Sequence, residues 1–213
     1  SQGSTVWSAT QSPFIIRRML IDMFEIEENK IRVIAPKDVG GGFGPKGMSY
    51  PEEVVVLALA QELGRPMKWV EDRREHFLST TQERDQIWDV SIAVDRTGQI
   101  LGLRGRLAHD AGAYIPWGII TPYISTTTIA GPYVVPAFKF DTTVVFTNKP
   151  PTSPLRGAGR PQAVFAMERT LDLVALKLDI DRAAIRRRNL INAEAMPYKM
   201  GLIFRDGAPV IYD

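Results

Sequence analysis

The chain has 213 residues, of which 45% are hydrophobic and 23% are charged, with a formal net charge of +2. These values are typical of a globular protein with a substantial core, and the charge is too small to favour nucleic acid or an anionic membrane as a partner. The absence of cysteine excludes disulfides, thiolate metal sites and a cysteine nucleophile within these residues, and a chain with two histidines is a poor candidate for a zinc site.

In the first part of the chain, the pattern of apolar and polar residues predicts helices that alternate with strands. Proline at the first helical position and glycine just after the last one mark two of the expected helix ends. The predicted helices cover residues 13–24 and 51–63, and the predicted strands cover residues 30–36 and 66–70.

The second part of the chain has a different character. Residues 86–95 and 99–109 are strand-like runs joined by a short polar turn, which predicts a hairpin, and a further strand is expected over residues 138–147. Helices are expected over residues 162–178 and, with Asp181 as its cap, to residue 188. This order predicts an α+β fold with mixed, largely antiparallel sheets and packed helices.

A glycine-rich loop over residues 40–47 is the strongest chemical signal, since successive glycines let backbone N–H groups converge on an anion or an oxo ligand. A phosphate-binding P-loop does not fit, because Lys46 is followed by Gly47 instead of a hydroxyl residue. A dinucleotide fingerprint from Gly42 to Gly47 stays open, with an acidic pair at residues 71–72 for the ribose. The late helix start, at Pro51, argues against that alternative.

A second unusual loop covers residues 148–162 and is rich in proline and small residues around Arg156 and Arg160. It leads into the predicted helix over residues 162–178, whose N-terminus favours an anion. The alternative is an exposed loop with two solvated arginines. His109 and Asp110 are interpreted as structural, because adjacent strand residues point to opposite faces.

Several segments, in order, resemble the molybdenum-cofactor-binding large subunits of the xanthine oxidase, aldehyde oxidoreductase and carbon monoxide dehydrogenase family. The matching segments are Thr10-Gln11, residues 39–46, residues 50–53, residues 63–66, residues 110–114, residues 131–133, residues 156–162 and residues 186–191. The resemblance covers nearly the whole chain, and it implies that residues 1–213 are a fragment of the cofactor-binding domain. The N-terminal part and a downstream second cofactor-binding domain would then lie outside it.

The resemblance also implies an activity and partners. Members insert oxygen from water into a C–H bond of an aldehyde or an N-heteroaromatic ring, using molybdenum bound by molybdopterin, here expected in its cytosine dinucleotide form. Iron–sulfur and FAD units are expected on partner chains, in an oligomeric enzyme. No apolar run reaches the ~20 residues of a membrane span, and we expect a cytoplasmic location.

Site residues are implied position by position. Gln11 matches a glutamine whose amide approaches a ligand of the metal, and Phe43 and Gly44 match a loop whose N–H groups face the oxo or sulfido ligands. Arg156 matches an arginine that orients the substrate or developing charge. The full set expected at the cofactor is Gln11, Gly41, Gly42, Phe43, Gly44, Arg156, Gly157 and Ala158, with molybdenum held through the pterin and no direct protein ligand.

Two departures from the family pattern reduce the range of expected substrates. Gly47 stands where purine-oxidising relatives have glutamate, which argues against xanthine, and Gly157 stands where carbon monoxide dehydrogenases have cysteine. The family's general base lies downstream of Asp213, so this chain alone is expected to be inactive. A dinucleotide (NAD or FAD) module built on residues 42–47 and a cofactor-free interaction domain are the alternative functions.

Overall fold

The computed structural model describes residues 3–117, 119–203 and 207–213. The chain divides into two compact units, residues 1–82 (unit 1) and residues 83–213 (unit 2). Along the described residues, no helix combines the length and apolar character needed to cross a bilayer.

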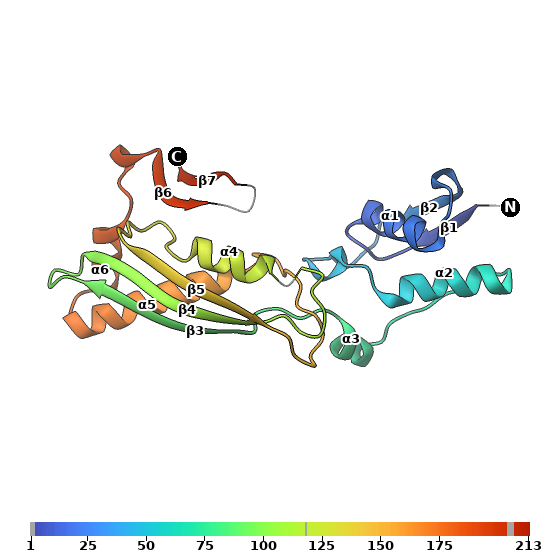
Figure 1. The fold of residues 1–213 in the computed structure, drawn as a ribbon, viewed down its shortest axis with the longest axis horizontal. Helices are drawn as coiled ribbons and strands as arrows, with labels where there is room; N and C mark the ends of the chain where they lie inside the picture. Colours follow the sequence, from blue (N-terminus) through green and yellow to red (C-terminus); the bar gives the residue numbers. More distant parts are fainter. Residues whose placement is uncertain (1–2, 118, 204–206) are drawn as a thin grey trace. The chain divides into compact units, whose positions relative to one another are not determined.

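Unit 1 is a small layer of helices on a two-stranded parallel sheet (Figure 1). Its elements are β1 (Ser4–Trp7), α1 (Pro13–Phe24), β2 (Ile31–Ile34), α2 (Pro51–Leu63) and α3 (Arg73–Ser79), with short 3-10 turns at Glu28–Lys30 and Pro45–Gly47. Ile16 and Leu20 of α1, Ile31 of β2 and Leu57 of α2 form its buried core. The connection from β2 to α2 is the glycine-rich loop, so this packing sets where the loop begins and ends.

The predicted helices of unit 1 are confirmed, and α2 ends at Gly64 with φ 62°. The strand predicted over residues 66–70 is wrong, because this segment is irregular in the structure. Apolar residues there, Trp69 and Val70, are 44% and 70% exposed, and a strand without a partner leaves its backbone groups unpaired. β1, which the sequence analysis did not predict, takes the role of partner to β2.

Unit 2 is built on a three-stranded sheet in the order β3-β4-β5. Figure 1 shows these strands running side by side, with α5 lying along the sheet. The elements are β3 (Gln86–Val94), β4 (Ile100–Asp110), α4 (Ile120–Thr128), β5 (Phe138–Val145), α5 (Arg160–Leu178), α6 (Arg182–Asn189), a 3-10 turn at Ala193–Ala195, and a hairpin of β6 (Tyr198–Ile203) and β7 (Pro209–Tyr212).

The α+β class with mixed sheets is confirmed, and the pairings follow from connection length. β3 and β4 are joined by a tight turn and pair antiparallel, whereas β4 and β5 pair parallel because residues 111–137, including α4, carry the chain back across the sheet. Side chains from β3, β4, β5 and α5, together with Ile129 just after α4, form one core, which includes Leu103, Met167 and Leu171.

Helix α4 escaped prediction because its sequence, ITPYISTTT, consists mostly of β-branched and hydroxyl residues of low helix propensity. In the structure its hydroxyl side chains donate hydrogen bonds to carbonyl oxygens one turn earlier. These pairs are Ser125 to Thr121, Thr126 to Pro122, Thr127 to Tyr123 and Thr128 to Ile124. Tertiary burial therefore overrides local propensity here, since Thr121, Ile124 and Ser125 are buried.

Candidate functional site

The glycine-rich loop of unit 1 has a backbone that few sequences adopt. The φ angles of Gly41, Phe43 and Gly44 are 89°, 54° and 117°. The left-handed region is easily reached by glycine and is costly for a bulky residue such as Phe43. The Phe43 ring is 57% exposed, so the loop presents this side chain outward.

Gln11, which lies 33 residues before Gly44, is attached directly to this loop. Its N–H donates to the Lys46 carbonyl at 3.0 Å, and its side-chain Oε1 accepts from the Gly44 N–H at 2.9 Å. The Thr10 hydroxyl also donates to the Lys46 carbonyl, at 3.0 Å. The structure thus brings together, within unit 1, the five predicted cofactor residues of the first part of the chain.

The loop has the features of a cradle for an oxygen- or sulfur-bearing group. A Cβ at Gly42 would lie 2.4 Å from Gln11 Oε1 and 3.0 Å from Gln11 Cβ, so a larger residue there would displace the Gln11 side chain. Among the described residues, the Phe43 N–H and the Gln11 Nε2 have no hydrogen-bond partner, which leaves two donors for a ligand. The Gly44 N–H is held by Gln11, so a ligand would compete for it. These residues fit the metal end of a molybdopterin cofactor.

The helix that follows the loop is fixed by a partly buried carboxylate. Glu53 accepts from the Tyr50 N–H at 3.0 Å and from the Ser8 hydroxyl. Burial raises the pKa of Glu53, while the bonds from Ser8 and Tyr50 act in the opposite direction. Glu53 therefore joins β1 to the start of α2, and a helix-capping role accounts for it.

In unit 2, the predicted residues Arg156, Gly157 and Ala158 form a tight turn before α5. The φ angles of Gly157, Ala158 and Gly159 are 107°, 49° and 93°. The Ala158 N–H donates to the Leu155 carbonyl at 2.7 Å. The Arg156 side chain is exposed and, within the described part of the chain, has no ion-pair partner. The turn therefore holds a free guanidinium on a strained backbone.

Glu83 lies beneath this turn, and the sequence analysis missed it. Its side chain is 2% exposed, and neither carboxylate oxygen has a hydrogen-bond partner of normal geometry among the described residues. Burial raises its pKa, although Arg84 and the N–H groups of Leu155 and Gly159 act to lower it. The helix N-terminus, which was predicted to favour an anion, thus has a carboxylate of the chain itself facing it.

Arg84 supports the same turn from its other side. Its Nη2 donates to the Arg156 carbonyl at 3.3 Å, and its Nη1 donates to the Gln162 Oε1 at 3.2 Å. Its Nη1 also lies 3.4 Å from Glu83 Oε2. The signal in the sequence was the polar run Gln82-Glu83-Arg84-Asp85-Gln86 directly before a strand, which by itself gives no distance to Arg156.

A chain of hydrogen bonds inside unit 2 reaches Thr152 and Gly159, on either side of Arg156. His109 contacts Thr152 Oγ1 through Nε2 at 3.2 Å and Gln86 Nε2 through Nδ1 at 3.3 Å. Gln86 donates to Ser125 Oγ at 3.1 Å, and the Ser125 hydroxyl shares its one proton between the carbonyls of Thr121 and Gly159, at 2.9 and 3.0 Å. Burial lowers the pKa of His109, which agrees with its interpretation as a structural residue.

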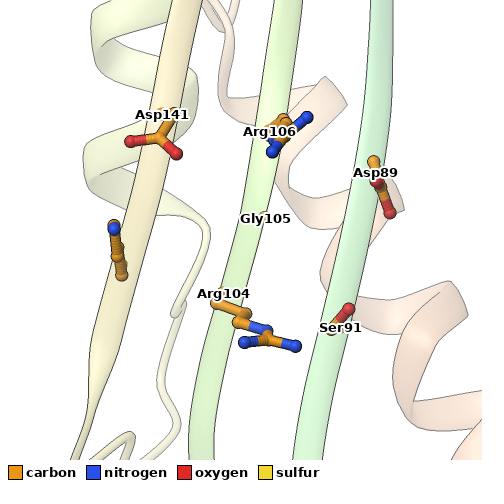
Figure 2. Close-up of a pocket in the computed structure, with 7 residues that line it drawn as sticks. Asp89, Ser91, Arg104, Gly105, Arg106 and Asp141 are labelled. Atoms are coloured by element: carbon orange, nitrogen blue, oxygen red, sulfur yellow. The ribbon is translucent and has the colours of Figure 1, made fainter.

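The outer face of the sheet in unit 2 carries a shallow charged hollow of about 440 Å³. Figure 2 shows Asp89, Arg106 and Asp141 in a row across the three strands, with Arg104 and Ser91 beside them. The strand register places Arg106 opposite both aspartates. None of the predicted site residues lies there, and alternating charges in cross-strand register stabilise a solvated sheet face.

Comparisons with known proteins identify the family of the chain. A family model for the molybdopterin cofactor-binding domain matches residues 1–190. The chain is 39% identical over 189 residues to the gamma subunit of the 6-hydroxypseudooxynicotine dehydrogenase complex of Paenarthrobacter nicotinovorans, covering 87% of this chain and 23% of the relative. It is 36% identical to the carbon monoxide dehydrogenase large chain of Hydrogenophaga pseudoflava, covering 91% of this chain and 24% of the relative.

Among solved structures, quinoline 2-oxidoreductase from Pseudomonas putida 86 matches with a TM-score of 0.88 and 37% sequence identity, covering 97% of this chain and 26% of that one. The chain therefore spans about a quarter of the length of the relatives that it matches. The late start of α2 at Pro51 and the absence of a strand over residues 66–70 remove the support for a dinucleotide fingerprint. The chain belongs to the molybdopterin cofactor-binding domain family, within the molybdenum hydroxylases.

Proposed function

We propose that this chain is the part of a molybdenum hydroxylase large subunit that holds the metal end of the cofactor, and that the whole enzyme hydroxylates an N-heteroaromatic or aldehyde substrate with water. The observation that carries the proposal is the attachment of Gln11 to the glycine loop, with Gly44 N–H donating to Gln11 Oε1 at 2.9 Å. This bond aligns the Gln11 amide and the Phe43 N–H as donors in one cradle.

The chain's residues have separable tasks in this proposal. When bound, the molybdenum cofactor supplies the redox chemistry that moves oxygen from water to a substrate carbon. Gln11 Nε2 and the Phe43 N–H provide preorganised donors toward the cofactor, which stabilise charge without reorganisation during the reaction. Arg156 provides a fixed positive charge for orienting the substrate or the charge that develops on it.

The substrate class is proposed from the relatives, with Gly47 and Gly157 standing against xanthine and carbon monoxide. The names of quinoline 2-oxidoreductase and nicotine 6-hydroxylase, 37% and 31% identical to this chain, indicate N-heteroaromatic substrates for those enzymes. Aldehyde oxidoreductase from Desulfovibrio gigas is 25% identical. A Cβ at Gly157 would lie 2.7 Å from Pro161 Cδ, so the turn itself requires glycine at this position and leaves no place for a cysteine side chain. We therefore place N-heteroaromatics ahead of aldehydes, and both ahead of xanthine and carbon monoxide.

The partners and the exact cofactor are part of the proposal. The names of several relatives, such as "subunit gamma" and "large chain", describe parts of multi-subunit enzymes. For this protein we propose iron–sulfur and FAD partner subunits that take up the electrons, the cytosine dinucleotide form of the pterin, and a cytoplasmic location. The catalytic base is proposed to lie outside this chain.

The cradle is tested by Gly42→Ala in the intact protein that contains this chain, produced with its partner subunits. A Cβ at Gly42 would lie 2.4 Å from Gln11 Oε1, so the glutamine must move and the cradle opens. We expect molybdenum per subunit, measured by mass spectrometry of the metal and the released pterin, to fall at least several-fold.

Gly40→Ala is the matched control, because a Cβ at Gly40 meets nothing within 4 Å in the same loop. The control should load molybdenum as the unaltered protein does. The proposal is wrong if the unaltered protein releases a nicotinamide or flavin dinucleotide from this subunit and no molybdenum. Equal loading of the Gly42 and Gly40 variants would show that the cofactor does not depend on this cradle.

A further inference from the structure

The turn that carries Arg156 needs an internal support. Gly157, Ala158 and Gly159 have φ angles of 107°, 49° and 93°. A left-handed alanine costs free energy that the surroundings must supply. Gly159 is the N-cap residue of α5 and offers no side-chain cap, so the first N–H groups of this 19-residue helix depend on other acceptors nearby.

The chain provides that support with a carboxylate and a guanidinium from one dipeptide. Glu83 is buried with its carboxylate near the N–H groups of Leu155 and Gly159, which lie on either side of Arg156. Arg84 donates to the Arg156 carbonyl itself. A negative charge at a helix N-terminus interacts favourably with the helix dipole. The Glu83 carboxylate thus lies beside two N–H groups of the turn, and the Arg84 guanidinium donates a hydrogen bond to its central carbonyl, that of Arg156.

The Glu83 carboxylate has no bond of normal geometry in the described part of the chain. A buried carboxylate with loose partners stabilises the fold poorly, because its desolvation is costly. Glu83 therefore contributes little to the stability of the fold. Its location is better explained by an effect on the conformation of the turn that carries Arg156.

We propose that Glu83, assisted by Arg84, is a positioning residue that fixes the Arg156 turn for the reaction. This inference rests on the proposed function, in which Arg156 orients the substrate or its developing charge. Glu83 touches neither the substrate nor the cofactor in this scheme and acts through the backbone of residues 155–159.

The test is a double-mutant cycle in the intact enzyme with its partner subunits. Glu83→Gln keeps the shape and removes the charge, and Arg156→Met removes the guanidinium. Glu194→Gln is the control, since Glu194 is exposed and its side chain forms no hydrogen bond or ion pair with the residues that the structure describes. We expect Glu83→Gln to lower kcat/KM on the order of 10-fold to 100-fold, because small displacements of orienting groups have effects of this size. The control should be unchanged.

The decisive comparison is made in the Arg156→Met background, where Glu83→Gln should cause no further loss. A residue that acts through Arg156 has nothing left to position there, whereas a general structural role would give additive losses. Equal losses in both backgrounds, or no loss in either, would overturn the proposal. If Glu83→Gln does not accumulate, Glu83→Asp takes its place, because a shorter side chain withdraws the carboxylate from the two N–H groups.

Limited trypsin digestion separates this proposal from the proposed function. Trypsin does not cut before proline, so between residues 148 and 162 the sequence offers one bond, Arg156–Gly157. If the unaltered protein contains no molybdenum, the proposed function fails, and cleavage at this bond decides the role of Glu83. Faster cleavage in Glu83→Gln than in Glu194→Gln supports positioning, and equal rates overturn it.

Discussion

At the scale of single residues, Asn189 shows how much depends on one buried amide. It is fully buried at the end of α6. Its Oδ1 accepts from the Ile100 N–H, and its Nδ2 donates to the carbonyls of Gly98 and Ile185, each at 2.8 Å. One side chain thus joins the last helix to the β3–β4 turn, which lies 89 residues or more away in the sequence.

Asn189→Ala removes the side-chain partner of the Ile100 N–H and of the Gly98 carbonyl. We expect a loss of about 2–3 kcal/mol in the free energy of unfolding. The measurement is urea unfolding of the 213-residue chain followed by tryptophan fluorescence. Asn192→Ala is the control, because Asn192 is exposed, and it should change stability by less than about 0.5 kcal/mol. Equal unfolding midpoints for the two variants would contradict the bridging role.

At the scale of elements, His109 at the end of β4 connects the sheet to Thr152 in the loop over residues 148–162. Burial lowers the pKa of His109, and the nearby charges of Asp110 and Asp85 only partly oppose this. The unfolded chain therefore binds a proton more readily than the folded chain. Stability from the neutral imidazole is present above pH ~6.5, the ordinary histidine value, and is lost as the pH falls toward the lowered folded pKa.

His109→Gln should remove this dependence. We expect the difference in unfolding free energy between pH 7.5 and pH 5.5 to be smaller in His109→Gln than in the unaltered chain, whatever the absolute stability of the variant. His76→Gln is the control, because His76 is partly exposed in α3. The same pH dependence in His109→Gln and the unaltered chain would mean that another group is responsible.

Elements also show where sequence patterns are sufficient. Helices α1, α2, α5 and α6 agree with the predicted ranges to within a few residues, because caps, prolines and apolar spacing are local signals. Asp181, the predicted cap of α6, accepts from the Ala184 N–H at 2.8 Å. The segment over residues 66–70 was predicted wrongly because a strand exists only with a partner, which no local pattern supplies.

At the scale of the whole molecule, the chain spans about a quarter of the relatives that it matches. We expect the isolated 213-residue chain to turn over neither quinoline nor an aldehyde with an artificial electron acceptor, while the intact enzyme with its partner subunits does so. The reason is that the proposed catalytic base and electron-transfer units lie outside this chain. Turnover by the isolated chain, at any rate above that of a boiled sample, would contradict this expectation.

By itself, the sequence determined the family, the α+β class and the two unusual loops, over residues 40–47 and 148–162. Glycine runs, proline positions and short motifs are local features that can be recognised without knowing which distant residues meet. Only the tertiary structure decided that Gln11 accepts a hydrogen bond from Gly44, that Glu83 and Arg84 lie next to the Arg156 turn, and that β5 pairs parallel to β4. The physical reason is that hydrogen bonds and burial join residues far apart in the chain, and neither propensity nor spacing records which distant groups will meet.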